Sequence, residues 1–201
     1  MYITFSIFGK AEYHIMYENS TNEQTQNPRS QKKAFAKALL STLSSLITAA
    51  AVVVLVCNFV FPVFKVTGSS MEPTLSKGQV VLCNKSADIK KGDVIAFYHN
   101  KKVLIKRVIG TPNDIVNLLD DGTVELNGNI LDEPYVSCKA VGECDTAFPF
   151  TVPSSRYFVM GDARDTSVDS RSSSVGCVAE ENIIGKLSLR VLPLDSSGKI
   201  K

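Results

Sequence analysis

The sequence predicts a mainly β protein, with a single N-terminal transmembrane helix followed by a mostly antiparallel, barrel-like β-sheet domain. Two observations carry this prediction. Residues 38–64 hold no formal charge and are mostly apolar, and about 20 such residues suffice for a helix to cross a bilayer. After residue 65 the chain changes to short segments rich in β-branched and aromatic residues, without a long helical period. We therefore expect a polar tail over residues 1–35, a membrane anchor over 36–64 and one β-rich domain over 65–201.

The apolar stretch fits an anchor better than its two alternatives. A buried core helix would be shorter and would keep a polar face. A cleavable signal peptide has an apolar core of about 7–15 residues followed by a small-x-small site, whereas bulky or cyclic residues occupy positions 61–64 here. Four basic residues lie between positions 29 and 37, and only Lys65 and Lys77 follow the stretch closely. The positive-inside rule then predicts a cytoplasmic N-terminus and an extracytoplasmic β domain.

The β domain is predicted from segments that alternate with turn residues. Lys91-Gly92 marks a turn before one segment, and Asn127-Gly128 is a hairpin turn signal. No internal repeat stands out, and the spacing favours a folded barrel or coiled sheet. The predicted strands lie within residues 79–84, 93–98, 102–110, 114–119, 123–131, 156–162 and 182–194.

Composition argues against several function classes. The formal net charge is +2, with both signs mixed along the chain, so we expect no nucleic-acid partner. No zinc-ligand spacing, phosphate-binding glycine loop or dinucleotide fingerprint occurs, so we expect no metal, nucleotide or other cofactor.

The cysteines leave one question open. Cys138 and Cys144 are separated by five residues in a glycine-containing loop, where they either form a small disulfide or remain two free thiols. Cys57 lies in the apolar stretch as a small apolar residue, and Cys83 and Cys177 are predicted core residues.

The segment TGSSMEPTL, residues 67–75, offers a candidate serine nucleophile, although the chain has only two histidines. Lys106 is a candidate base. On a strand it shares a face with Leu104 and Val108, while Arg107 points the other way. An ammonium group on an apolar face loses hydration, which lowers its pKa and makes neutral lysine available as a base. Alternatively, Lys106 is an ordinary strand residue whose amine reaches solvent.

Four blocks occur in order after the apolar stretch: GSSMEPTL, KGDVIAFY, IKRVIGTPND and MGDARDTSVDSRSSSVG. Together they resemble the bacterial type I signal peptidases, membrane serine endopeptidases that remove signal peptides from exported proteins. The resemblance covers residues 36–194 and implies that Ser70 is the nucleophile and Lys106 the general base of a Ser/Lys dyad. It also implies that Ser167 orients the lysine amine, while Ser69 has no catalytic role.

The same resemblance assigns supporting and substrate-binding residues. Asp162 and Arg171 match a pair that ties the loop of the last block together, and Asp169 holds that loop near the dyad. The role expected of all three is primarily structural. Some members of the family have a serine at the position of Gly68, and its hydroxyl donates to the oxyanion. Glycine has no hydroxyl, so backbone N–H groups, including that of Ser70, must form the oxyanion hole here. Other members share this glycine.

The resemblance further implies exported preproteins as substrates and the bacterial cytoplasmic membrane as location. An extended substrate is expected to pair with strand edges near residues 64–68 and 104–105. Val66, Leu75 and Ile105 are expected to line shallow pockets beside Gly68 and Leu104, which suits cleavage after Ala-x-Ala. A catalytically silent relative would lack the serine or the lysine, and self-cleaving SOS repressors lack a membrane span.

Overall fold

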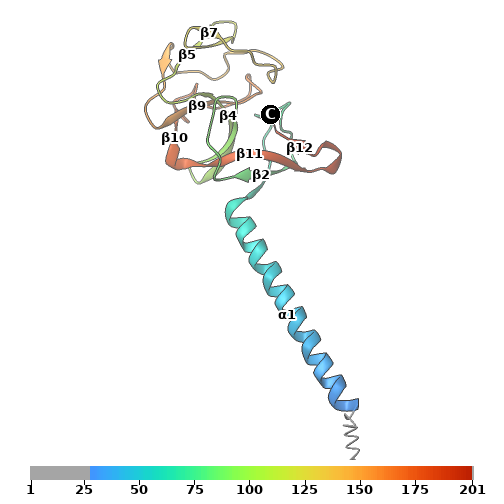
Figure 1. The fold of residues 1–201 in the computed structure, drawn as a ribbon. Helices are drawn as coiled ribbons and strands as arrows, with labels where there is room; N and C mark the ends of the chain where they lie inside the picture. The colour runs from blue at the N-terminus through green and yellow to red at the C-terminus, as the bar shows by residue number, and fades with distance from the viewer. Residues whose placement is uncertain (1–27, 201) are drawn as a thin grey trace, which may run out of the picture. The chain divides into compact units, whose positions relative to one another are not determined.

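The structure is a computed structural model that describes residues 28–200 (Figure 1). Of the predicted tail, residues 1–27 lie outside the described residues. Residues 28–35 already belong to helix α1, which runs from Pro28 to Val60. Proline at the start of a helix costs no hydrogen bond, because the first N–H groups have no partner within the helix.

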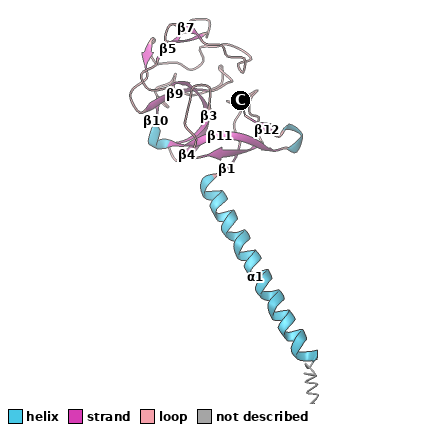
Figure 2. Ribbon diagram, in the orientation of Figure 1, coloured by secondary structure: helices cyan, strands magenta, loops and turns pink. Residues whose placement is uncertain are grey.

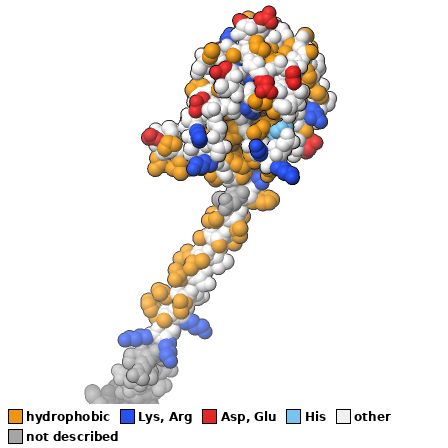
Figure 3. Space-filling view, turned by 180° about the vertical axis from the view of Figure 1, so that it is seen from behind, with side chains coloured by type: hydrophobic (Ala, Val, Ile, Leu, Met, Phe, Trp, Pro, Cys, Tyr) orange, Lys and Arg blue, Asp and Glu red, His pale blue; other side chains and the backbone are white. Residues whose placement is uncertain are grey.

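Helix α1 is long and apolar enough to cross a membrane. Its segment Phe35–Val56 has a mean hydropathy of 2.3 over 22 residues, with exposed side chains throughout. Figure 3 shows hydrophobic side chains along the helix and basic ones near its N-terminal end. The predicted anchor extends to residue 64, but the helix ends at Val60. Pro62 explains the difference, since proline lacks the N–H donor and disfavours a helical residue before it.

Two antiparallel sheets form the β domain, and apart from α1 the described chain is strands, loops and two short 3-10 turns (Figure 2). The larger sheet has the order β1-β2-β11-β3-β4-β9-β10, with β12 also paired to β11, and the smaller has the order β7-β6-β5-β8. The strands are β1 (Val63–Lys65), β2 (Val80–Asn84), β3 (Val94–His99), β4 (Lys102–Gly110), β5 (Ile115–Leu118), β6 (Val124–Leu126), β7 (Asn129–Ile130), β8 (Phe150–Thr151), β9 (Arg156–Met160), β10 (Val178–Ala179), β11 (Ile183–Leu192) and β12 (Gly198–Lys199).

The predicted strands and the mainly β class are confirmed, and the Asn127-Gly128 turn is present. Asn127 has φ of 53° and Gly128 has φ of 79°, as a two-residue hairpin with two positive φ values requires. Strand β1 is not among the predicted strands: its first two residues, Val63 and Phe64, continue the apolar run of the predicted anchor, and only Lys65 lies beyond it.

Buried side chains form three clusters, of which one sets the position of the candidate nucleophile. It contains Met71 and Leu75, from the loop after β1, packed with Val81, Val94 and Leu187 from three strands. Burying an aliphatic side chain contributes about 1.5–3 kcal/mol, so these two residues hold the loop against the sheet.

Candidate active site

Ser70 lies in a turn-rich loop that is fixed at both ends. The N–H of Val66 donates to the carbonyl oxygen of Gln79 at 2.8 Å, which continues the pairing beyond β1. The N–H of Leu75 donates to the carbonyl oxygen of Met71 at 2.7 Å, and both side chains are buried. Ser70 itself is only partly buried, so its hydroxyl sits on a rigid loop with access from outside.

Lys106 is buried on the central strand β4, opposite Ile95 of β3. Only 3% of its surface is exposed, so the alternative in which its amine reaches solvent is wrong. Burial lowers the pKa of the amine from 10.5 to about 8, against the opposing effect of the nearby Asp169 carboxylate. A substantial fraction of Lys106 is therefore neutral and available as a base near neutral pH.

Ser167 connects the lysine to a buried carboxylate. Lys106 Nζ donates to Ser167 Oγ at 2.7 Å, and Ser167 Oγ donates to Asp169 Oδ2 at 2.7 Å. A hydroxyl has one hydrogen, and here Asp169 accepts it. The oxygen lone pairs of Ser167 are thus left to accept from the amine, which fixes the direction in which Nζ points.

Asp169 is held in place by Arg171 and by the loop backbone. Arg171 donates from Nε to Oδ1 at 2.9 Å and from Nη2 to Oδ2 at 2.9 Å, and both side chains are fully buried. The N–H of Gly161 donates to Oδ2 at 2.9 Å. Burial alone would raise the pKa of Asp169, but the hydrogen bonds and charge of Arg171 outweigh it and hold the pKa below its ordinary value. Asp169 therefore stays ionised.

Gly161 is the point where the serine loop and the lysine's support meet. A side-chain Cβ at this position would collide with Ser167 Oγ and would lie 2.5 Å from the carbonyl oxygen of Ser70. That same carbonyl accepts a hydrogen bond from the N–H of Ala163 at 3.1 Å. The absence of a side chain at 161 thus allows Ser70 to approach the group that binds Lys106.

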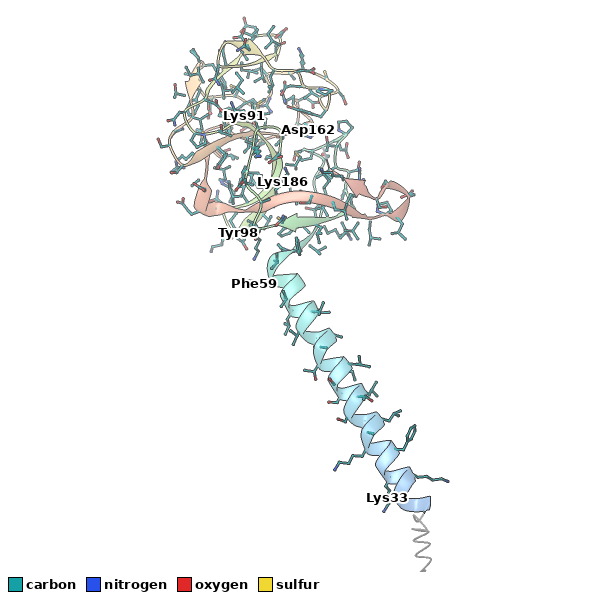
Figure 4. The ribbon with its side chains drawn as sticks, in the orientation of Figure 1. Lys33, Phe59, Lys91, Tyr98, Asp162 and Lys186 are labelled. Carbon is teal, nitrogen blue, oxygen red and sulfur yellow. The ribbon has the colours of Figure 1, made fainter. Side chains whose placement is uncertain are left out.

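Asp162 pairs with Arg107, not with Arg171. Arg107 donates from Nε to Oδ1 at 2.9 Å and from Nη2 to Oδ2 at 2.7 Å. Thr74, from the serine loop, donates to the same carboxylate, and the Arg107 guanidinium stacks 3.8 Å above the Tyr135 ring. Asp162 (labelled in Figure 4) therefore ties β4 to the serine loop. In place of the expected Asp162–Arg171 pair there are two separate pairs, Arg107 with Asp162 and Arg171 with Asp169.

The expected substrate-binding residues fall into two groups. Leu75 is fully buried and Val66 is 5% exposed, and both belong to the core cluster that holds the serine loop. Gly68 is exposed, and Leu104 and Ile105 are partly buried. Ile105 packs on the cluster that contains Val66, whereas Leu104 packs on a different cluster.

Several features of the site have no clear sequence signal. Alternation along β4 indicates only that Arg107 faces away from Lys106, yet Arg107 is 1% exposed. Arg164 and Glu133 form another buried pair, 31 positions apart in sequence. Cys138 and Cys144 are free thiols, as are Cys83 and Cys177; the side chain of Cys57 lies outside the described residues. Within residues 28–200, no cluster of His, Cys, Asp or Glu side chains is arranged to hold a metal.

Known proteins are similar to this chain in sequence. The model of the family "Signal peptidase, peptidase S26" matches residues 39–192. Signal peptidase I T of Bacillus subtilis is 31% identical over 90% of this chain and 100% of its own length. Signal peptidase IB of Staphylococcus aureus is 34% identical over 78% of this chain and 91% of its own. A crystal structure of a signal peptidase I from Enterococcus faecalis V583 is 30% identical, covers 51% of this chain and 98% of its own, and has a TM-score of 0.44. The chain therefore belongs to the signal peptidase family, peptidase S26.

Proposed function

We propose that this protein is a membrane-anchored serine endopeptidase that removes signal peptides from exported preproteins, with Ser70 as nucleophile and Lys106 as general base. Membership of the signal peptidase family supports the reaction class. One structural observation carries the dyad: a lysine with a pKa of about 8 is buried against Ser167, beside the loop that presents Ser70.

The reaction follows from these groups. Neutral Lys106 accepts the proton of Ser70 Oγ while that oxygen attacks the carbonyl carbon of the scissile bond. The carbonyl oxygen becomes an oxyanion, stabilised by backbone N–H groups that include that of Ser70. The protonated lysine then donates to the leaving amine, and the C–N bond breaks to leave an acyl-enzyme. Water, deprotonated by the same lysine, hydrolyses that ester and restores Ser70.

Two unpaired strand edges support the binding of an extended substrate. Within the described residues, β1 pairs only with β2. Strand β9 pairs with β4 from Arg107 onward, which leaves Lys102–Lys106 without a partner on that side. An extended peptide adds to such edges through main-chain hydrogen bonds. Gly68, Val66 and Ile105 would then face the residues before the cut, where only small side chains fit, as in Ala-x-Ala.

The membrane places enzyme and substrate together. Basic residues at positions 29–37 favour a cytoplasmic N-terminus, so the β domain would be extracytoplasmic, at the bacterial cytoplasmic membrane. The bilayer is then a partner of α1, and cleavage is favoured for chains whose signal peptide is itself held in the membrane.

Cleavage of a preprotein with an Ala-x-Ala signal end tests this proposal. Detergent-solubilised wild type is compared with Ser70→Ala, Lys106→Ala and the neighbouring Ser69→Ala. Wild type and Ser69→Ala should cut after the second Ala, and the two dyad variants should lose at least about 10³-fold in rate. Cleavage by Lys106→Ala at the wild-type rate would refute the assigned base.

A further inference from the structure

A cavity of about 470 Å³ borders the serine loop. Glu72 and Pro73, the second and third residues after Ser70, line it. Ala163, whose N–H binds the carbonyl oxygen of Ser70, and Asp165 line it as well. Ser70 and Lys106 do not line this cavity, so it is a neighbour of the dyad and not part of it.

The assignment of the substrate residues leads to this cavity. The substrate residues before the scissile bond are assigned to the strand edges at residues 64–68 and 104–105 of the enzyme. These edges come before Ser70 and Lys106 in the sequence. The cavity is lined by none of the residues at these edges, and it borders the serine loop at Glu72 and Pro73, so it is available to the part of the substrate that follows the bond. Its volume lies within the range of about 300–1,000 Å³ that is usual for ligand pockets.

The free charges in the cavity are negative. Its two buried charged groups are already neutralised: Asp162 by Arg107 and Arg164 by Glu133. Glu72 and Asp165 are exposed, and within residues 28–200 neither carboxylate has a hydrogen bond or ion pair. Two unpaired carboxylates that line one cavity attract a cation into it.

We propose that this cavity binds the first residues of the mature protein, on the C-terminal side of the scissile bond, and that Glu72 and Asp165 select for basic side chains there. This inference rests on the proposed function, because it assigns the second half of the same substrate. It predicts that the enzyme distinguishes substrates with identical signal peptides by the first residues of their mature chains.

Three preproteins that share one Ala-x-Ala signal and carry Lys-Lys, Gln-Gln or Glu-Glu at the second and third mature positions test the selection. Wild type should show kcat/KM in the order Lys, Gln, Glu, with about fivefold between the extremes. The ratio should fall toward one in Glu72→Gln/Asp165→Asn. It should persist in the control Asp120→Asn/Glu181→Gln, which removes the same charge from exposed positions outside the cavity. Equal rates in wild type, or an unchanged ratio in the cavity variant, would overturn the selection.

Cys138 gives a direct test of placement, because this exposed thiol lines the same cavity. In Ser70→Ala/Cys144→Ser enzyme, a preprotein with cysteine at the third mature position should form a mixed disulfide under mild oxidation. Moving that cysteine far along the mature chain, or the added change Cys138→Ser, should abolish the product. Equal cross-linking from both positions would refute the placement. If wild type cuts none of the preproteins, the proposed function fails; if it cuts all of them without preference, only this inference fails.

Discussion

Lys106 and Arg107 are consecutive on β4, both are buried, and they serve different carboxylates on opposite faces of the strand. Lys106 reaches Asp169 through Ser167, whereas Arg107 binds Asp162 directly. The first arrangement leaves the cation without a carboxylate in direct contact, so burial dominates and lowers its pKa. The second pairs the guanidinium bidentately with a carboxylate. One strand thus supplies the proposed base and a structural tie from adjacent positions.

The pKa of Lys106 predicts the pH dependence of cleavage. The neutral amine is the active form, so kcat/KM should rise as pH increases through about 8 and level off above it. Asp169 raises the pKa of Lys106, so Asp169→Asn should shift the rise in kcat/KM to lower pH. Asp88 is exposed, and Asp88→Asn should leave the rise at the same pH. A rate that is flat between about pH 6 and 9 would contradict the assignment.

Lys106 should also cost stability at neutral pH. Its pKa is about 8 in the folded protein against 10.5 as the ordinary value, so the folded state disfavours the proton by about 3 kcal/mol below pH 8. Lys106→Met should be inactive, yet melt several degrees higher than wild type at neutral pH. Between pH 8 and 10.5 the unfolded chain binds the proton and the folded one does not, so wild type gains stability and the difference closes.

Thermal melting of the detergent-solubilised full chain across about pH 6–11 measures that difference. The exposed lysine of the same strand provides the control, since Lys102→Met should change the melting temperature by an amount that does not vary over this range. If the difference in melting temperature between Lys106→Met and wild type is also independent of pH, packing and not the buried charge determines that difference.

Sequence pattern was sufficient for features that depend on residue types within a short segment, such as strand β4. It left open whether the Lys106 amine is buried, because alternation places Lys106 and Arg107 on opposite faces of the strand and the structure buries both. The partners of Asp162 and Arg171 do not follow from such a pattern, because pairing between residues far apart depends on how the loop folds back. Gly161 shows the same limit: its importance lies in the approach of Ser70 and Ser167, which only the fold creates. Leu75 shows the limit again: the sequence does not tell whether an apolar residue near the serine packs in the core, and only the fold shows that this side chain is fully buried, while its pocket role stays a prediction.

Gly161→Ala should reduce activity far more than stability. Its Cβ would displace both Ser167 and the carbonyl of Ser70, so we expect at least about 10²-fold loss in kcat/KM, as small misplacements of reacting groups cause. Gly110→Ala is the matched control, since its Cβ would crowd Val116 and Val152, at 2.9 and 3.0 Å. The control should lower the melting temperature and keep the activity of the folded enzyme. Similar activity losses in the two variants would refute this role of Gly161.

Removing one partner of the Arg107–Asp162 pair should destabilise the fold more than removing both. Asp162→Asn leaves a buried arginine without its counter-charge, which costs about 3–5 kcal/mol. The double variant Arg107→Met/Asp162→Asn removes both charges and should recover part of that loss. Melting of the two single variants and the double variant gives the coupling. Additive effects would mean that the pair contributes nothing beyond the separate side chains.

Gly68→Ser tests whether the oxyanion site accepts another donor. A Cβ at Gly68 meets no atom within 4 Å, so a serine side chain fits without moving the loop. Members of the family with serine here use its hydroxyl as a donor, and one such donor contributes about 10²–10³-fold in rate. Gly68→Ala adds the same Cβ without the hydroxyl and is the matched control. We expect a higher kcat in Gly68→Ser than in Gly68→Ala; equal values in the two variants would mean that the backbone N–H groups already satisfy the oxyanion.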